Sequence, residues 1–258
     1  ILRACQGIHN PYRNGLAIYN HSLTGPGQLI AEASDNTKYS AGIGGDENQS
    51  GGSLIINGGI IQSTGGYFGA AGIGGGYNNS GSYITTNGGF VTANGGNQAA
   101  GIGGGMFGSG SNITINGGCV TATGEINGAG IGGGKEGPGS NITINGGMVT
   151  ANGGRNAAGI GGGEKGSGSN IRIASELTVY ADNTNPPTTE ISHTDNDIAS
   201  YIAALRYVIV KDEMTNVKNE AIAAIGVNRS IDSSRSKLQM GQTKRYLGGI
   251  VRPVCSNK

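Results

Sequence analysis

The sequence predicts an all-β fold: a parallel, right-handed β-helix of five to six coils, followed by a nonrepetitive C-terminal segment. Three observations predict it. The chain has 53 glycines among 258 residues, the element AGIGG recurs every 29 to 30 residues, and apolar residues alternate with polar ones in short runs inside each repeat. A period in this range is typical of solenoids, and period-two alternation is typical of strands with one buried face. The handedness follows from the preference of parallel crossover connections.

Each repeat contains three short strand-like elements. One repeat shows the pattern in the runs NITI, VTAT and AGIG, whose inward-facing pairs are predicted to be Ile113 and Ile115, Val120 and Ala122, and Ala129 and Ile131. The AGIG element supplies the register mark of the array, an isoleucine at positions 43, 73, 102, 131 and 160. Three strands per repeat, all wound in the same direction, predict a solenoid with three sides.

Glycine and asparagine mark the corners between these strands. The run NGG occurs at Asn87, Asn116 and Asn145, and Asn-Gly is ordinary turn chemistry because both residues accept positive φ. Glycine also lets one coil approach the next closely. Since equivalent residues stack from coil to coil, we expect the corner asparagines to form a ladder of side-chain amides.

Composition divides the chain into three parts. Residues 1–40 are predicted to form an N-terminal cap and a degenerate first coil, with strand-like runs at 15–22 and 27–34. Residues 41–183 form the glycine-rich β-helix. Residues 184–258 lose the glycine pattern and have mixed or undetermined structure.

Charge and cysteine content narrow the classes of partner. The formal net charge is +1, which favours neither nucleic acid nor an anionic membrane, and no apolar run is long enough for membrane insertion. No Cys/His ligand spacing occurs, so we expect no metal and no cofactor. Of the three cysteines, Cys5 and Cys255 lie near the two chain ends, and Cys119 lies in the repeat. The sequence allows a disulfide between Cys5 and Cys255 but does not decide whether it forms.

One outward column of the second strand is apolar where polar residues are expected. Its members are Ile60, Phe90, Cys119 and Met148. Such a column needs cover. Two interpretations stay open: the C-terminal segment packs on it, or it is an interface with another molecule.

Aromatic residues gather in adjacent coils beside asparagine and give the candidate binding site. Its members are Tyr67, Phe68, Tyr77, Asn78 and Phe107. Flat aromatic faces stack on the CH-rich faces of sugars, so we expect a glycan platform there; the alternative is that these rings fill corners or contact the C-terminal part of the chain.

Acidic residues of the repeat do not form a catalytic pair. They occur singly at corners, and none share an outward strand column, so neither a general acid and base nor a calcium cage is predicted. We expect no catalytic residue and no enzyme. Stacking places Lys135 near Glu164 and Glu136 near Lys165, which predicts ion pairs between coils.

The pattern SNITINGGxVTAxGGxxAAGIGGG, over about residues 41–174, resembles the glycine-rich repeats of bacterial cell-surface and secreted proteins, which are similar to carbohydrate-binding β-helix domains. The resemblance implies an extracellular or cell-surface location and contact with a glycan or protein partner. We therefore expect a non-catalytic, adhesin-like or structural protein that presents its variable corners. Two alternatives are a subunit that self-assembles into an extracellular filament or homo-oligomer, and a polysaccharide lyase or hydrolase.

Overall fold

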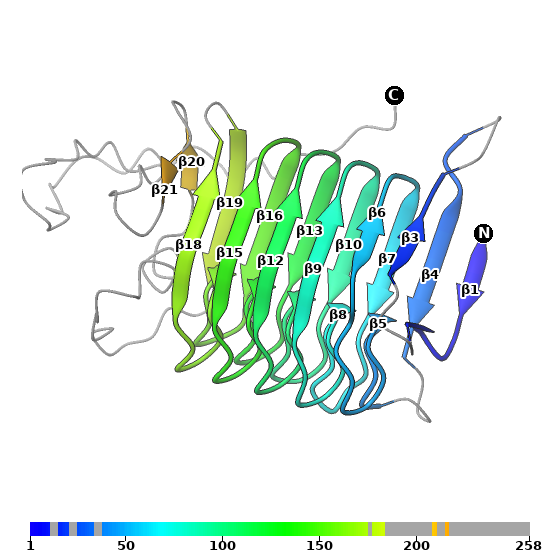
Figure 1. Ribbon diagram of the computed structural model, residues 1–258, viewed down its shortest axis with the longest axis horizontal. Coiled ribbons are helices and arrows are strands. Elements are labelled where there is room, and N and C mark those ends of the chain that lie inside the picture. Colours follow the sequence, from blue (N-terminus) through cyan, green and yellow to red (C-terminus); the bar gives the residue numbers. More distant parts are fainter. Residues whose placement is uncertain are drawn as a thin grey trace, which may run out of the picture.

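The computed structural model is an all-β parallel solenoid of about six coils, as the sequence predicts (Figure 1). The structure describes residues 1–10, 15–20, 25–33, 38–174, 177–183, 208–210 and 215–216. No helix occurs among them, and so none that is long and apolar enough to cross a membrane.

Three sheets run along the solenoid, each built from one strand per coil. Sheet 1 has the order β1 (Leu2–Ala4), β4 (Gln28–Glu32), β7 (Ile60–Thr64), β10 (Phe90–Asn94), β13 (Cys119–Thr123), β16 (Met148–Gly153), β19 (Leu177–Asn183) and β20 (Val208–Val210). Sheet 2 has the order β17 (Ile160–Gly161), β14 (Ile131–Gly132), β11 (Ile102–Gly103), β8 (Ile73–Gly74), β5 (Ile43–Gly44) and β2 (Ile8–His9). Sheet 3 has the order β21 (Thr215–Asn216), β18 (Gly168–Ile173), β15 (Gly139–Ile144), β12 (Gly110–Ile115), β9 (Gly81–Thr86), β6 (Leu54–Ile56) and β3 (Leu16–Ile18).

Strands of successive coils pair in parallel and in register. In sheet 2, Ile102 lies beside Ile73 on one side and Ile131 on the other. β20 and β21 are different, because they pair antiparallel with β19 and β18. Two of the three sheets therefore end, at the C-terminal side of the solenoid, in a strand of opposite direction.

Aliphatic side chains from all three sheets fill the narrow core. Ile102, Ile131 and Ile160 are at most 1% exposed and stack one above another. The sequence-predicted third strand is shorter than expected: Ala129 is buried but precedes β14, because its N–H donates to Gly133 O of the same coil at 2.9 Å. The core position was predicted correctly and the strand boundary was not.

The predicted amide ladder forms at the corner between sheets 3 and 1. Asn87 Nδ2 donates to Asn57 Oδ1 at 2.8 Å, Asn116 to Asn87 at 2.9 Å, and Asn145 to Asn116 at 2.9 Å. Asn87 and Asn116 each donate to the preceding coil and accept, through the side-chain oxygen, from the next. Such ladders stabilise in-register stacking, since a shifted coil would leave these polar groups without partners.

Glycine in sheet 2 lets the coils touch backbone to backbone. Gly103 has φ 134°, and a Cβ built on it would lie 2.0 Å from Gly132 O of the next coil. Gly74 stands in the same relation to Gly103. No side chain fits at this position without moving the neighbouring coil.

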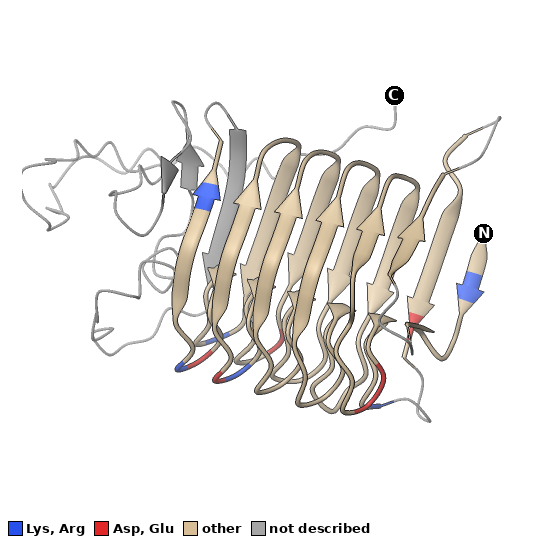
Figure 2. Ribbon diagram, viewed as in Figure 1, with Lys and Arg blue, Asp and Glu red and all other residues tan. Residues whose placement is uncertain are grey.

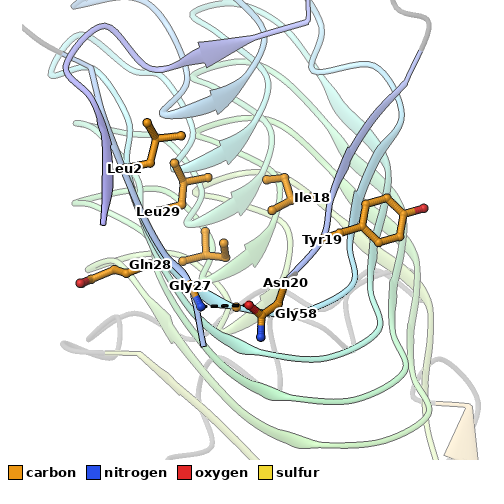
Figure 3. A pocket seen from close by; sticks show the side chains of 10 residues that line it. Leu2, Ile18, Tyr19, Asn20, Gly27, Gln28, Leu29 and Gly58 are labelled. Atoms are coloured by element: carbon orange, nitrogen blue, oxygen red, sulfur yellow. Dashed lines mark hydrogen bonds between the residues drawn. The ribbon is translucent and has the colours of Figure 1, made fainter. Parts of the chain in front are cut away.

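Among the described residues, nothing covers the N-terminal end of the core. β1 and β2, within the segment assigned to a cap from sequence, extend sheets 1 and 2 by pairing with β4 and β5. Figure 3 shows Leu2 and Leu29 on one wall and Ile18 on the opposite wall of a cavity of about 350 Å³. Because its walls are core side chains and edge strands, this cavity is the exposed end of the core.

We expect Gly103→Ala to lower the free energy of unfolding by about 2 kcal/mol or more, because the methyl group meets a fixed backbone oxygen. Gly88→Ala is the matched control: its Cβ would meet Asn57 O at 3.5 Å, an ordinary contact, so the change should stay within about 0.5 kcal/mol. Chemical denaturation followed by circular dichroism measures both. Equal losses for the two variants would contradict the close-approach account.

Candidate functional site

Two variable corners lie side by side along one rim of the solenoid. Corner B connects sheet 1 to sheet 2, and corner C connects sheet 2 to sheet 3; the sheet 2 strand between them has only two residues. Corner C of one coil bonds to corner B of the coil before it: Tyr77 N–H donates to Tyr39 O at 2.7 Å, and Met106 N–H donates to Gly69 O at 2.7 Å. Side chains from neighbouring coils therefore meet on this rim.

Four aromatic rings and one lysine form a contiguous cluster there, which we call the aromatic corner: Lys38, Tyr39, Tyr67, Phe68 and Tyr77. Tyr39 stacks on Phe68 with centroids 5.2 Å apart, and it meets Tyr77 edge-on at 5.3 Å. Tyr67 meets Phe68 edge-on at 5.1 Å, and Lys38 Nζ lies 5.8 Å from the Phe68 centroid. Tyr67 remains 67% exposed. The cluster thus presents ring surface to solvent.

The other two predicted site residues lie at equivalent positions of corner C. In the coil of β12, Gly108 N–H donates to Gly105 O at 2.8 Å and closes a tight turn, whose third residue, Phe107, has φ 61°. Asn78 occupies this position one coil earlier, with φ 58°. Asparagine is suited to left-handed backbone, whereas a bulky aromatic residue is unfavourable there. Phe107 is nevertheless present and 45% exposed.

Tyr83 shows the same exception on sheet 3. It has φ 58° and aligns with the asparagines of the next three coils, Asn112, Asn141 and Asn170, whose φ values lie between 51° and 53°. Asn170 Nδ2 donates to Asn141 Oδ1 at 2.6 Å. Tyr83 replaces an amide of this second ladder with an exposed ring, but it lies on a sheet and not on the rim of corners B and C.

Two amides near the aromatic corner lack hydrogen-bond partners. Asn97 Oδ1 and Gln98 Oε1 are both buried and unpaired. Asn97 N–H donates to Tyr67 O at 3.0 Å, which places this amide directly beside the cluster. An unpaired buried acceptor costs about 1–3 kcal/mol.

The middle of the solenoid carries no charge. No Lys, Arg, Asp, Glu or His occurs between Glu47 and Glu125, and Figure 2 shows the central coils without coloured residues. Charges appear on the rim at either side of this stretch. Lys38, whose Nζ lies over the Phe68 ring, is the cation of the aromatic corner.

Only one of the two predicted ion pairs forms. Lys165 Nζ lies 4.0 Å from Glu136 Oε1, whereas no ion pair joins Lys135 to Glu164, both of which are described residues. The partners of the existing pair are 70% and 45% exposed. It is therefore a weak, solvated contact between coils.

A serine, a histidine and an aspartate meet near the N-terminal end, in the wrong order for nucleophile activation. Ser40 Oγ donates to Asp46 Oδ1, and His9 Nδ1 lies 3.9 Å from Asp46 Oδ2. The Ser40 hydrogen bond, together with the Glu47 N–H and the His9 charge, lowers the pKa of Asp46 despite partial burial. His9 Nε2 is buried without a partner, and the histidine does not touch Ser40 as a catalytic base must. In the described part of the chain, no group of three or more His, Cys, Asp or Glu could hold a metal.

The four residues of the predicted interface align in sheet 1. Ile60, Phe90, Cys119 and Met148 are register partners on β7, β10, β13 and β16, and each is half-buried. Cys119 is disulfide-bonded. Cys5 is an exposed free thiol, so the pairing of Cys5 with Cys255 that the sequence left open does not form.

The structure unites three of the five predicted binding residues in one cluster, Tyr67, Phe68 and Tyr77. It adds Lys38 and Tyr39, which sequence reasoning missed because the segment before β5 departs from the repeat. Phe107 follows Met106, whose N–H bonds to Gly69 in corner B, so it lies one coil further along the same rim. Asn78 is exposed beside Tyr77.

Comparison with protein families gives four matches to a model described as a β-helix repeat. The matched segments are residues 54–77, 84–106, 113–135 and 142–164. Each begins on a sheet 3 strand and ends in or near corner C, so the chain contains β-helix repeats in the register observed. Comparisons with curated proteins and with solved structures give no match. Asn78, Tyr83 and Phe107 lie between the matched segments.

We expect Phe107→Asn to raise the free energy of unfolding by about 0.5–1 kcal/mol, because asparagine relieves the left-handed backbone. Met106→Asn, the neighbouring residue without positive φ, is the matched control and should give no gain. Thermal and urea unfolding measure both variants. A loss of stability in Phe107→Asn would show that the ring contributes more to packing than its backbone position costs.

Proposed function

We propose that this β-helix protein is a non-catalytic, extracellular or cell-surface protein that binds a neutral glycan through the aromatic corner and Phe107. The observation that carries the proposal is the contact cluster of four aromatic rings from successive coils on an exposed rim. Aromatic faces stack on the apolar faces of sugar rings. Such a surface needs little rearrangement to bind, because the coils hold the rings in place.

The chemistry of the rim favours an uncharged ligand. An acidic polysaccharide calls for several cations, whereas the coils beside the aromatic corner have none between Glu47 and Glu125. The exposed amide of Asn78 on the same rim suits sugar hydroxyls, which donate hydrogen bonds to its oxygen. A neutral hexose polymer combines both features: CH-rich faces and many hydroxyl donors.

The disulfide at Cys119 supports an extracellular location, because disulfides persist mainly in oxidising compartments. The resemblance of the repeat to bacterial surface proteins points the same way. An adhesin-like role follows if the glycan belongs to another cell.

Two alternatives have less support. A filament of stacked solenoids would need a free parallel edge at both ends, but β20 and β21 occupy that edge in sheets 1 and 3 with antiparallel strands. A polysaccharide lyase or hydrolase would need a cluster of acidic or basic groups; at the aromatic corner Asp46 is engaged with Ser40 and His9 instead.

The direct test is a glycan array carrying neutral and acidic polysaccharides, followed by titration calorimetry with the best ligand. We expect binding to a neutral glycan, and about tenfold weaker binding for Tyr67→Ala and for Phe107→Asn, since one lost ring contact removes about 1.4 kcal/mol. Phe107→Asn is informative because its expected stability gain separates binding from folding.

Tyr83→Asn serves as the control, because it removes an exposed aromatic ring on sheet 3 rather than on the rim, and its binding should equal that of the parent protein. Binding to acidic glycans alone, or equal affinity for all three variants, would contradict the proposed site. Release of sugar fragments from the bound glycan would contradict the non-catalytic role.

A further inference from the structure

Sheet 1 carries a continuous apolar column on its outward face. Its members, Ile60, Phe90, Cys119 and Met148, are paired in register across four neighbouring strands. The next outward position on the same strands is polar throughout, with Gln62, Thr92, Thr121 and Thr150. The apolar column is therefore a local feature and not a general property of the sheet.

At a strand spacing of about 4.8 Å, the apolar column extends about 14 Å across the sheet. Contiguous apolar surface of this kind usually marks a contact. The column residues are only half-buried, although they point away from the core. The remaining question is what lies against them.

The cysteines indicate which segment lies against the apolar column. Cys119, in the middle of the column, is disulfide-bonded, and Cys5 is free. The chain has three cysteines, so within one molecule only Cys255, which lies outside the described residues, is left as the partner. We propose that a Cys119–Cys255 disulfide fastens the end of the C-terminal segment across the apolar column and covers it.

Chain length and composition agree with this occupant. The last described strand, β21, ends at Asn216 and pairs with β18 of sheet 3, three strand positions from β12, the strand that precedes β13 and its Cys119. The 38 residues from 217 to 254 can extend up to about 125 Å, far more than the roughly 14 Å of three strand spacings. Ile250, Val251 and Val254 immediately precede Cys255 and supply apolar side chains to cover Phe90 and its neighbours.

The tether forms by ordinary thiol–disulfide exchange. The two thiols together lose two protons and two electrons to a small disulfide such as oxidised glutathione, which leaves as two reduced thiols. A dithiol such as dithiothreitol reverses the step and is itself oxidised to a cyclic disulfide. Reduction therefore frees the cover and exposes the apolar column, while the coils stay intact because backbone hydrogen bonds between coils and the aliphatic core hold them.

Peptide mapping of the intact protein without reductant tests the pairing. Trypsin should yield a disulfide-linked pair of the peptides 39–135 and 246–258, which separates on reduction. Cys5→Ser provides the background variant and should give the same linked pair. Cys119 found as a free thiol, bonded to Cys5, or bonded to Cys119 of a second molecule in a reducible dimer would overturn the proposal.

Dye binding tests the cover. We expect the fluorescence of anilinonaphthalene sulfonate to rise on reduction, and Cys255→Ser to show the same raised signal without reductant, while the circular dichroism of the solenoid is unchanged. Adding Phe90→Thr and Met148→Thr to the Cys255→Ser variant should abolish the rise, and Cys5→Ser should not alter it. A mapped Cys119–Cys255 bond whose reduction leaves dye binding unchanged would overturn the covering role. Neither measurement involves the glycan.

Discussion

The direct contact of backbone on backbone between successive coils is the constraint on which the rest of the structure depends. At Gly74 and Gly103 the next coil approaches so closely that a Cβ would lie 2.0 Å from its carbonyl oxygen. Because only glycine permits this approach, its recurrence fixes how the coils stack. The parallel sheets, the isoleucine stacks and the amide ladders all follow from that register.

The same constraint confines variation to the corners. A side chain that faces the core or the neighbouring coil is limited in size and polarity, whereas the exposed residues of corners B and C, such as Tyr67 and Phe107, are free of both limits. The two-residue strands of sheet 2 bring these corners together, so that Tyr39 and Tyr77, far apart in sequence, touch. Phe107, on this rim, occupies a left-handed backbone position that is unfavourable for an aromatic residue, and backbone strain of this kind is often found where a surface is used for binding.

Much of the fold could be predicted from the sequence, because its repeat records the stacking directly: Ile102, Ile131 and Ile160 share one position of a periodic pattern and one column of the core. Less of the candidate site could be predicted from the sequence. Tyr39 precedes β5 in a segment without the repeat, so spacing could not align it with Phe68. The strand at Ile131 is short because the Ala129 N–H donates to Gly133 O of its own coil. The alternation of apolar residues does not indicate which carbonyl accepts this hydrogen bond. Cys119 is disulfide-bonded, and no local sequence pattern around it predicts a disulfide.

The central claim is that complete coils are interchangeable units stacked in register. Deletion of residues 131–159 removes one whole coil, joins Gly130 to Ile160, and spares the aromatic corner and Cys119. This shortened chain should fold cooperatively with the same circular dichroism signature, only modestly less stable than the parent, because solenoid stability is close to a sum over repeats. Deletion of residues 131–144, half a coil, should abolish cooperative unfolding, since every later strand would move to the wrong side. A folded half-coil variant, or an unfolded whole-coil variant, would contradict the account.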